Sequence, residues 1–156
     1  MKYLINFLFI SVSFISIGQN TYFDLKKDTV KLDTAKTNII VCFSTNSCHD
    51  CYITLEKFFY YSDAYTNKDL NISTLSFIDS SSLNNISMRK VFYNNSKYYF
   101  PAVKQRLFTA KKEEKCILFN TELDERLFPV VCVWKGESRK FFTYEDFITY
   151  YSLNNY

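Results

Sequence analysis

The chain has 156 residues, enough for one domain, and 47% of them are hydrophobic, so a real core can form. Two glycines and two prolines argue against a disordered chain and a turn-dense small β-sandwich, and they exclude a glycine-rich phosphate loop. The formal net charge of +3 is too weak and too scattered to indicate a nucleic-acid partner.

The N-terminus has the pattern of a secretory signal. Lys2 gives a short positive start, residues 4–17 are mostly apolar, and small residues follow. We predict a signal peptide over residues 1–18, cleavage before Gln19, and a periplasmic or secreted protein. The apolar stretch is shorter than the roughly 20 residues that span a membrane, and no later segment is long enough, so no transmembrane segment is expected after cleavage. An uncleaved N-terminal anchor is the alternative.

The first half of the mature chain predicts alternating strands and helices. Residues 19–37 are polar, with one edge strand at most. The apolar run at 38–43 predicts a central strand covered on both faces. Apolar residues at helical spacing predict a helix from 48 to about 65. Alternation over 71–79 predicts a second strand, and a serine cap then predicts a helix over about 83–93.

The next stretch has weaker signals. Asn94-Asn95-Ser96 indicates a turn, residues 102–110 allow a second helical piece, and residues 115–120 allow a short strand. We interpret residues 94–120 as an insert within a single domain that spans residues 19–156.

The C-terminal part predicts a hairpin and a helix. Residues 130–134 form an apolar run typical of a buried strand, a turn follows at 135–138, and 139–142 is the returning strand. Thr143 can cap a final helix. Strands that alternate with helices need crossover connections, so we expect an α/β fold with a partly parallel, mixed central sheet.

The most informative motif is Cys48-His49-Asp50-Cys51, which follows the strand predicted at 38–43 and a short polar turn, and opens the first predicted helix. Two cysteines three positions apart at a helix start can close a small disulfide. Backbone N–H groups and the helix dipole favour a negative charge there, so the Cys48 thiolate forms more easily than in water. Because the thiolate is the attacking species in thiol–disulfide exchange, Cys48 and Cys51 are candidate catalytic residues.

The two intervening residues are candidates for tuning the site. A His49 imidazolium would lower the pKa of the Cys48 thiol, whereas the Asp50 carboxylate would raise it. The balance stays open, and His49 can equally be a solvated residue in the first helical turn.

Other chemistries lack partners in the sequence. A zinc site needs a second cysteine pair, but Cys42, Cys116 and Cys132 each lie within an apolar run and are interpreted as core thiols. The only histidine lies inside the CxxC motif, so we predict no metal and no cofactor. A Ser-His-Asp hydrolase is set aside because no Gly-x-Ser-x-Gly elbow exists.

Three features together resemble the thioredoxin superfamily over roughly residues 35–153. They are the strand–turn–helix with CxxC at the helix start, Phe128-Pro129 directly before a buried strand, and a Trp134-Lys135-Gly136-Glu137 hairpin. The long stretch between Asp79 and Pro129 is similar to the exported TlpA-like, AhpC/TSA-related branch. The resemblance implies a thioredoxin-like three-layer fold, with a mixed central sheet flanked by helices.

The resemblance also implies roles. Cys48 matches the attacking cysteine and Cys51 the resolving one, while Pro129 matches a cis-proline that leaves the backbone of Phe128 available to an extended substrate segment. The implied partners are protein thiols or disulfides and a redox partner protein.

This sequence departs from the family pattern at three places. Ser47 replaces a tryptophan, the intervening pair is His49-Asp50 where Gly-Pro is usual, and Cys42 replaces a buried acid that assists proton transfer.

Two functions follow as hypotheses. The first is an exported thiol–disulfide oxidoreductase that acts on protein disulfides. The alternative is a non-catalytic binding module with a structural disulfide, in which the aromatic clusters at 58–61 and 98–100 form a docking face. Core packing is the competing interpretation of those clusters.

Overall fold

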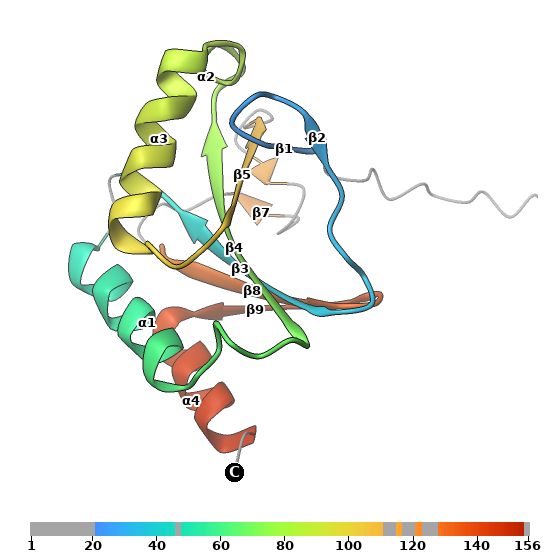
Figure 1. Cartoon of the computed structure of the whole chain (residues 1–156), viewed down its shortest axis with the longest axis vertical. Coiled ribbons are helices and arrows are strands. Elements are labelled where there is room, and N and C mark those ends of the chain that lie inside the picture. Colours follow the sequence, from blue (N-terminus) through green and yellow to red (C-terminus); the bar gives the residue numbers. More distant parts are fainter. Residues whose placement is uncertain (1–20, 46–47, 111–114, 117–120, 123–127, 155–156) are drawn as a thin grey trace, which may run out of the picture.

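The computed structural model describes residues 21–45, 48–110, 115–116, 121–122 and 128–154. These residues form a seven-stranded sheet in the order β2-β1-β5-β4-β3-β8-β9, a two-stranded β6-β7 ribbon, and four helices (Figure 1). The strands are β1 (Tyr22–Phe23), β2 (Thr29–Val30), β3 (Thr37–Phe43), β4 (Leu70–Ile78), β5 (Gln105–Ala110), β6 (Lys115–Cys116), β7 (Thr121–Glu122), β8 (Val130–Lys135) and β9 (Ser138–Thr143). The helices are α1 (His49–Tyr61), α2 (Ser80–Asn84), α3 (Ile86–Tyr99) and α4 (Tyr144–Asn154).

The sheet is mixed, as predicted. β3, β4 and β5 run parallel, connected by α1 and by α2 with α3, whereas β8, β9, β1 and β2 pair antiparallel with their neighbours. The central strand β3 pairs on both sides, and its last six residues are all buried. This explains why the residues from Ile39 to Phe43 are apolar without alternation.

The described helices cover one face of the sheet. Ile39, Val41 and Phe43 of β3 face a core that includes Phe59 of α1 and Phe147 of α4. Phe108 lies on this same face, because the parallel register runs from Phe43 through β4 to Phe108, and it packs with residues of α2 and α3.

The opposite face of the sheet carries a second core cluster. Its buried members are Tyr22, Ile40, Cys42, Leu75, Phe77, Leu107, Phe128 and Cys132. Cys42 and Cys132 are thiols within this cluster, which confirms their interpretation as core residues; the side chain of Cys116 lies outside the described part of the chain.

Two predictions for the middle of the chain are wrong. Residues 102–110 do not form a helix, because Gln105–Ala110 is the parallel strand β5, held between β4 and β1. Asn94-Asn95-Ser96 is not a turn, because α3 continues through these residues to Tyr99. Ser96 itself is buried. For residues 105–110, pairing with β4 and β1 overrides the local preference.

Other boundaries also shift. α1 ends at Tyr61, where about 65 was predicted, and the predicted helix at 83–93 is divided into α2 and α3 at Asn85, whose side chain caps α3. Of the strand predicted at 115–120, Lys115–Cys116 is confirmed and 117–120 lie outside the described residues.

The predicted signal peptide, residues 1–18, also lies outside the described residues. No helix in the described ranges is long and apolar enough to cross a membrane.

The C-terminal hairpin matches its prediction. Gly136 has a φ of +56°, a conformation that glycine adopts without a steric penalty, and this allows the tight connection between β8 and β9. The Trp134 indole N–H donates to the Gly136 carbonyl at 2.7 Å, and the Arg139 guanidinium lies 4.2 Å from the centroid of the indole ring.

The core under α1 can be tested with adjacent aromatic residues. Phe59 is fully buried, whereas Tyr60 is 69% exposed. Phe59→Ala should lower the free energy of unfolding by about 3–5 kcal/mol, because it leaves a cavity between α1, the sheet and α4. Tyr60→Ala should change it by less than about 0.5 kcal/mol. Urea unfolding of the oxidised protein measures both, and equal losses would contradict this placement of α1.

Candidate active site

The two motif cysteines lie at the amino end of α1, just after the carboxyl end of β3. They form a disulfide with an Sγ–Sγ distance of 1.97 Å and a Cα–Cα distance of 5.3 Å. Cys48 is the N-cap residue and is exposed, whereas Cys51 is only 9% exposed. Of the two sulfurs, that of Cys48 is therefore the one open to an approaching partner.

The backbone of the helix already favours charge on the outer sulfur. The Cys51 N–H donates to Cys48 Sγ at 3.2 Å, so the sulfur takes the place of the oxygen that usually caps a helix. After reduction, an N–H donor and the positive end of the helix dipole would both stabilise a thiolate there.

Tyr52 fixes the motif relative to the sheet. Its hydroxyl accepts a hydrogen bond from the Ser44 N–H at 2.8 Å and lies 3.1 Å from the Ser44 carbonyl, to which it donates. Its buried ring lies 4.9 Å from the ring of Phe43, the last residue of β3. The first turn of α1 is thus tied to the exit of the central strand.

The segment around Pro129 lies at the end of the sheet where β3 terminates and the cysteine motif follows. The Phe128–Pro129 peptide bond is cis, as the resemblance implies. Val130 pairs with Cys42, so Pro129 lies beside the end of β3, at the edge from which the motif emerges. The Phe128 side chain is 5% exposed and packs against Phe77 in the second core cluster, with ring centroids 6.3 Å apart.

His49 and Asp50 are both exposed, but only His49 contacts another element through its side chain. Its Nδ1 lies 2.7 Å from the Tyr99 hydroxyl at the end of α3. Sequence reasoning placed Tyr99 in an aromatic cluster without linking it to His49, because the two residues are 50 positions apart and no local pattern brings them together.

The predicted aromatic clusters divide between core and surface. Phe59 and Phe100 are fully buried, which favours core packing for these two. Tyr60, Tyr61 and Tyr98 are 69%, 80% and 73% exposed.

A half-buried carboxyl lies further along α1. The Tyr65 hydroxyl donates to the Glu56 carboxylate. Burial raises the pKa of Glu56, and this outweighs the hydrogen bond and the charge of the buried Arg106, which both lower it. Burial, together with Glu56, raises the pKa of Tyr65 as well.

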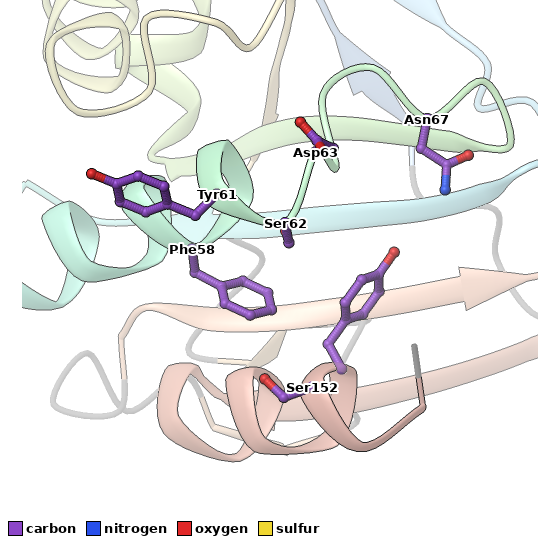
Figure 2. Close-up of a pocket in the computed structure, with 7 residues that line it drawn as sticks. Phe58, Tyr61, Ser62, Asp63, Asn67 and Ser152 are labelled. Carbon is purple, nitrogen blue, oxygen red and sulfur yellow. The ribbon is translucent and has the colours of Figure 1, made fainter. Parts of the chain in front are cut away.

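A separate cavity of about 480 Å³ lies at the other end of α1. Figure 2 shows Phe58 and Tyr61 of α1 on one side and Ser152 of α4 on the other, with Asp63 and Asn67 from the following loop. A helix of 13 residues is roughly 20 Å long, so this cavity is not part of the cysteine site. Within the described residues, no group of three or more His, Cys, Asp or Glu side chains could hold a metal ion.

Neither a family model nor a curated protein matches the sequence. Solved structures do match. A thiol:disulfide interchange protein from Bacteroides sp. has a TM-score of 0.56 at 15% identity, over 86% of this chain and 84% of that one. A candidate thiol-disulfide oxidoreductase from Bacteroides vulgatus has a TM-score of 0.52 at 16% identity, over 83% and 76%. A domain of a possible thiol-disulfide isomerase from Cytophaga hutchinsonii has a TM-score of 0.50 at 14% identity, over 85% and 88%.

At such low identity these likenesses establish the fold, which is the thioredoxin-like fold of thiol–disulfide oxidoreductases. The expected thioredoxin-like α/β fold with a mixed central sheet is therefore confirmed, and within the described residues the helices lie on one face of that sheet. This chain places a CxxC disulfide at the amino end of a helix within that fold, and a cis-proline segment at the same edge of its sheet.

The raised pKa of Glu56 predicts how stability depends on pH. A carboxyl whose pKa is raised in the folded protein stabilises the fold below its unfolded pKa, and this stabilisation is lost as the pH rises through the folded pKa. Glu56→Gln keeps an acceptor for Tyr65 but cannot ionise. The free energy of unfolding of Glu56→Gln minus that of wild type should therefore increase as the pH rises from about 4 to about 7.

Chemical denaturation at several pH values measures this difference. Glu137→Gln, in the exposed β8–β9 turn, is the matched control for replacing one glutamate on the surface. A Glu56→Gln advantage that shrinks as the pH rises would contradict the proposed effect of burial.

Proposed function

We propose that this chain is an exported thiol–disulfide oxidoreductase that acts on protein disulfides through Cys48 and Cys51. The observation that carries the proposal is the disulfide at the start of α1, with one exposed sulfur that accepts a backbone N–H and a second sulfur that is nearly buried. The thioredoxin-like fold, shared with thiol–disulfide oxidoreductases, supports it.

The chemistry proceeds in two balanced exchanges. The Cys48 thiolate attacks one sulfur of a substrate disulfide, forms a mixed disulfide, and releases the other substrate sulfur as a thiolate. The Cys51 thiolate then attacks Cys48 Sγ, which closes the 48–51 disulfide and releases the second substrate thiolate. The substrate gains two electrons and the protein loses two. The same steps in reverse oxidise a dithiol, so the partner that resets the site sets the direction.

The unequal exposure of the two sulfurs supports this division of roles. Cys51 is 9% exposed, so a bulky protein disulfide meets Cys48 first. Cys51 is then already within bonding distance of Cys48 Sγ, which makes the second exchange intramolecular and fast compared with attack by a second protein.

A binding role for Phe128 and Pro129 completes the site. The segment lies at the edge of the sheet beside the end of β3, and we propose that the backbone of Phe128 pairs with an extended stretch of substrate next to its disulfide. His49 and Asp50 would tune the Cys48 thiolate in opposite directions. The signal-like N-terminus supports export, to a compartment where disulfides persist.

A trapping experiment tests the exchange mechanism. Cys51→Ser should accumulate a stable mixed disulfide on Cys48 when it is reduced and then mixed with a disulfide-bonded protein, because the resolving step is removed. Cys48→Ser is the matched control, and it should trap at least about tenfold less because Cys51 is nearly buried. Non-reducing gels and mass spectrometry measure the adducts, and equal trapping by both variants would contradict the assigned roles.

The second candidate function is a binding module in which the disulfide is only structural. The exposed aromatic side chains of Tyr60, Tyr61 and Tyr98 favour it, because exposed tyrosines are common at protein interfaces. The two functions differ in how the folded protein meets a reductant. A wild-type disulfide that resists dithiothreitol until the protein unfolds would support the module and reject the enzyme.

A further inference from the structure

We propose that Tyr99 is a positioning residue for the redox motif: its hydroxyl holds the His49 imidazole beside the start of α1. This inference rests on the proposed function, because it assigns a role within the same cysteine site. The contact joins the motif to the end of α3, and the Tyr99 hydroxyl lies 2.7 Å from His49 Nδ1. The two rings meet edge to face, with centroids 5.1 Å apart.

The Tyr99 ring is held by the residues that hold the motif itself. Its centroid lies 5.8 Å from that of Phe43 at the end of β3 and 5.1 Å from that of Tyr52 in the first turn of α1. Phe100, the next residue, is fully buried, and its N–H donates to the Ser96 carbonyl at 2.9 Å. The hydroxyl therefore occupies a fixed place relative to the CxxC motif.

The hydrogen bond can serve both protonation states of His49. A phenol O–H donates more strongly than the phenol oxygen accepts, so we expect a neutral imidazole to accept the hydrogen bond of the Tyr99 O–H at Nδ1 and to carry its own proton on Nε2; an imidazolium donates from Nδ1 to the phenol oxygen. Tyr99 can thus fix the orientation of the ring without preventing a change of charge. The titratable residues next to His49 in the sequence are Cys48 and Asp50, and the Tyr98 ring meets the Tyr99 ring edge to face, with centroids 5.1 Å apart.

Without this contact, His49 would be an exposed side chain on the first turn of a helix, with several rotamers available. An imidazolium spread over those rotamers would have a weaker average effect on the Cys48 thiolate than one held in place. A net hydrogen bond of ordinary strength changes such populations by roughly two- to tenfold. Tyr99 is therefore expected to determine how strongly His49 acts on Cys48.

A conservative pair of variants tests this. Tyr99→Phe keeps the ring contacts and removes the hydroxyl. Tyr98→Phe removes a hydroxyl from the adjacent, 73% exposed residue and is the matched control. Since His49 is the only histidine, its ring signals in NMR spectra of the full chain are unambiguous. In the oxidised protein, Tyr99→Phe should increase the population of the Nδ1–H tautomer, and Tyr98→Phe should leave it unchanged.

The effect on the thiol is measured with Cys51→Ser as background. The pH profile of Cys48 alkylation should shift with Tyr99→Phe in the same direction as with His49→Ala, corresponding to a roughly two- to tenfold change in rate on the slope of the profile. Adding Tyr99→Phe to His49→Ala should change nothing further, because the hydroxyl acts only through the imidazole.

An unchanged tautomer in Tyr99→Phe overturns the inference, and so does an alkylation shift that Tyr99→Phe produces equally without His49. Failure of the proposed function has a different signature. In that case Cys48 forms no mixed disulfide with a protein disulfide in any variant, whatever the imidazole signals show.

Discussion

The site depends on the place where the chain leaves β3 and enters α1. Tyr52 bonds through its hydroxyl to both the N–H and the carbonyl of Ser44, while its ring packs on Phe43. This contact sets the first turn of α1 against the central strand. Cys48 is the N-cap of this same helix turn, and the Tyr99 ring of α3 packs on the Tyr52 ring, with centroids 5.1 Å apart.

The cysteine site combines a local hydrogen bond with groups that come from distant parts of the sequence. The hydrogen bond from the Cys51 N–H to Cys48 Sγ belongs to four consecutive residues. The cis peptide before Pro129 and the hydroxyl of Tyr99 arrive from distant parts of the chain, through the pairing of β8 with β3 and the packing of α3 on the helix-covered face. Local sequence thus supplies the reactive group, and topology supplies its surroundings.

The sequence was sufficient for the strands and helices with strong periodicity. The apolar run of β3, the CxxC helix and the β8–β9 hairpin are each encoded by neighbouring residues. β5 was missed because its buried Arg106 breaks the apolar pattern of a central strand; the guanidinium is satisfied in part by the carbonyl of Phe100. For the site, the two cysteines could be predicted from their spacing, and the cis-proline was implied by the family resemblance. The link between His49 and Tyr99 could not be predicted, because no spacing rule encodes it.

The single tryptophan has a practical meaning for anyone who follows this protein by fluorescence. Trp134 pairs with Asn38, near the end of β3 that lies far from the cysteines, and the five residue steps from Asn38 to Phe43 span roughly 17 Å. Its indole is enclosed locally by Arg139 and the Gly136 carbonyl. Its emission should therefore report unfolding of the sheet rather than reduction of the disulfide. The oxidation state of the cysteines has to be followed by tyrosine fluorescence or by mass spectrometry.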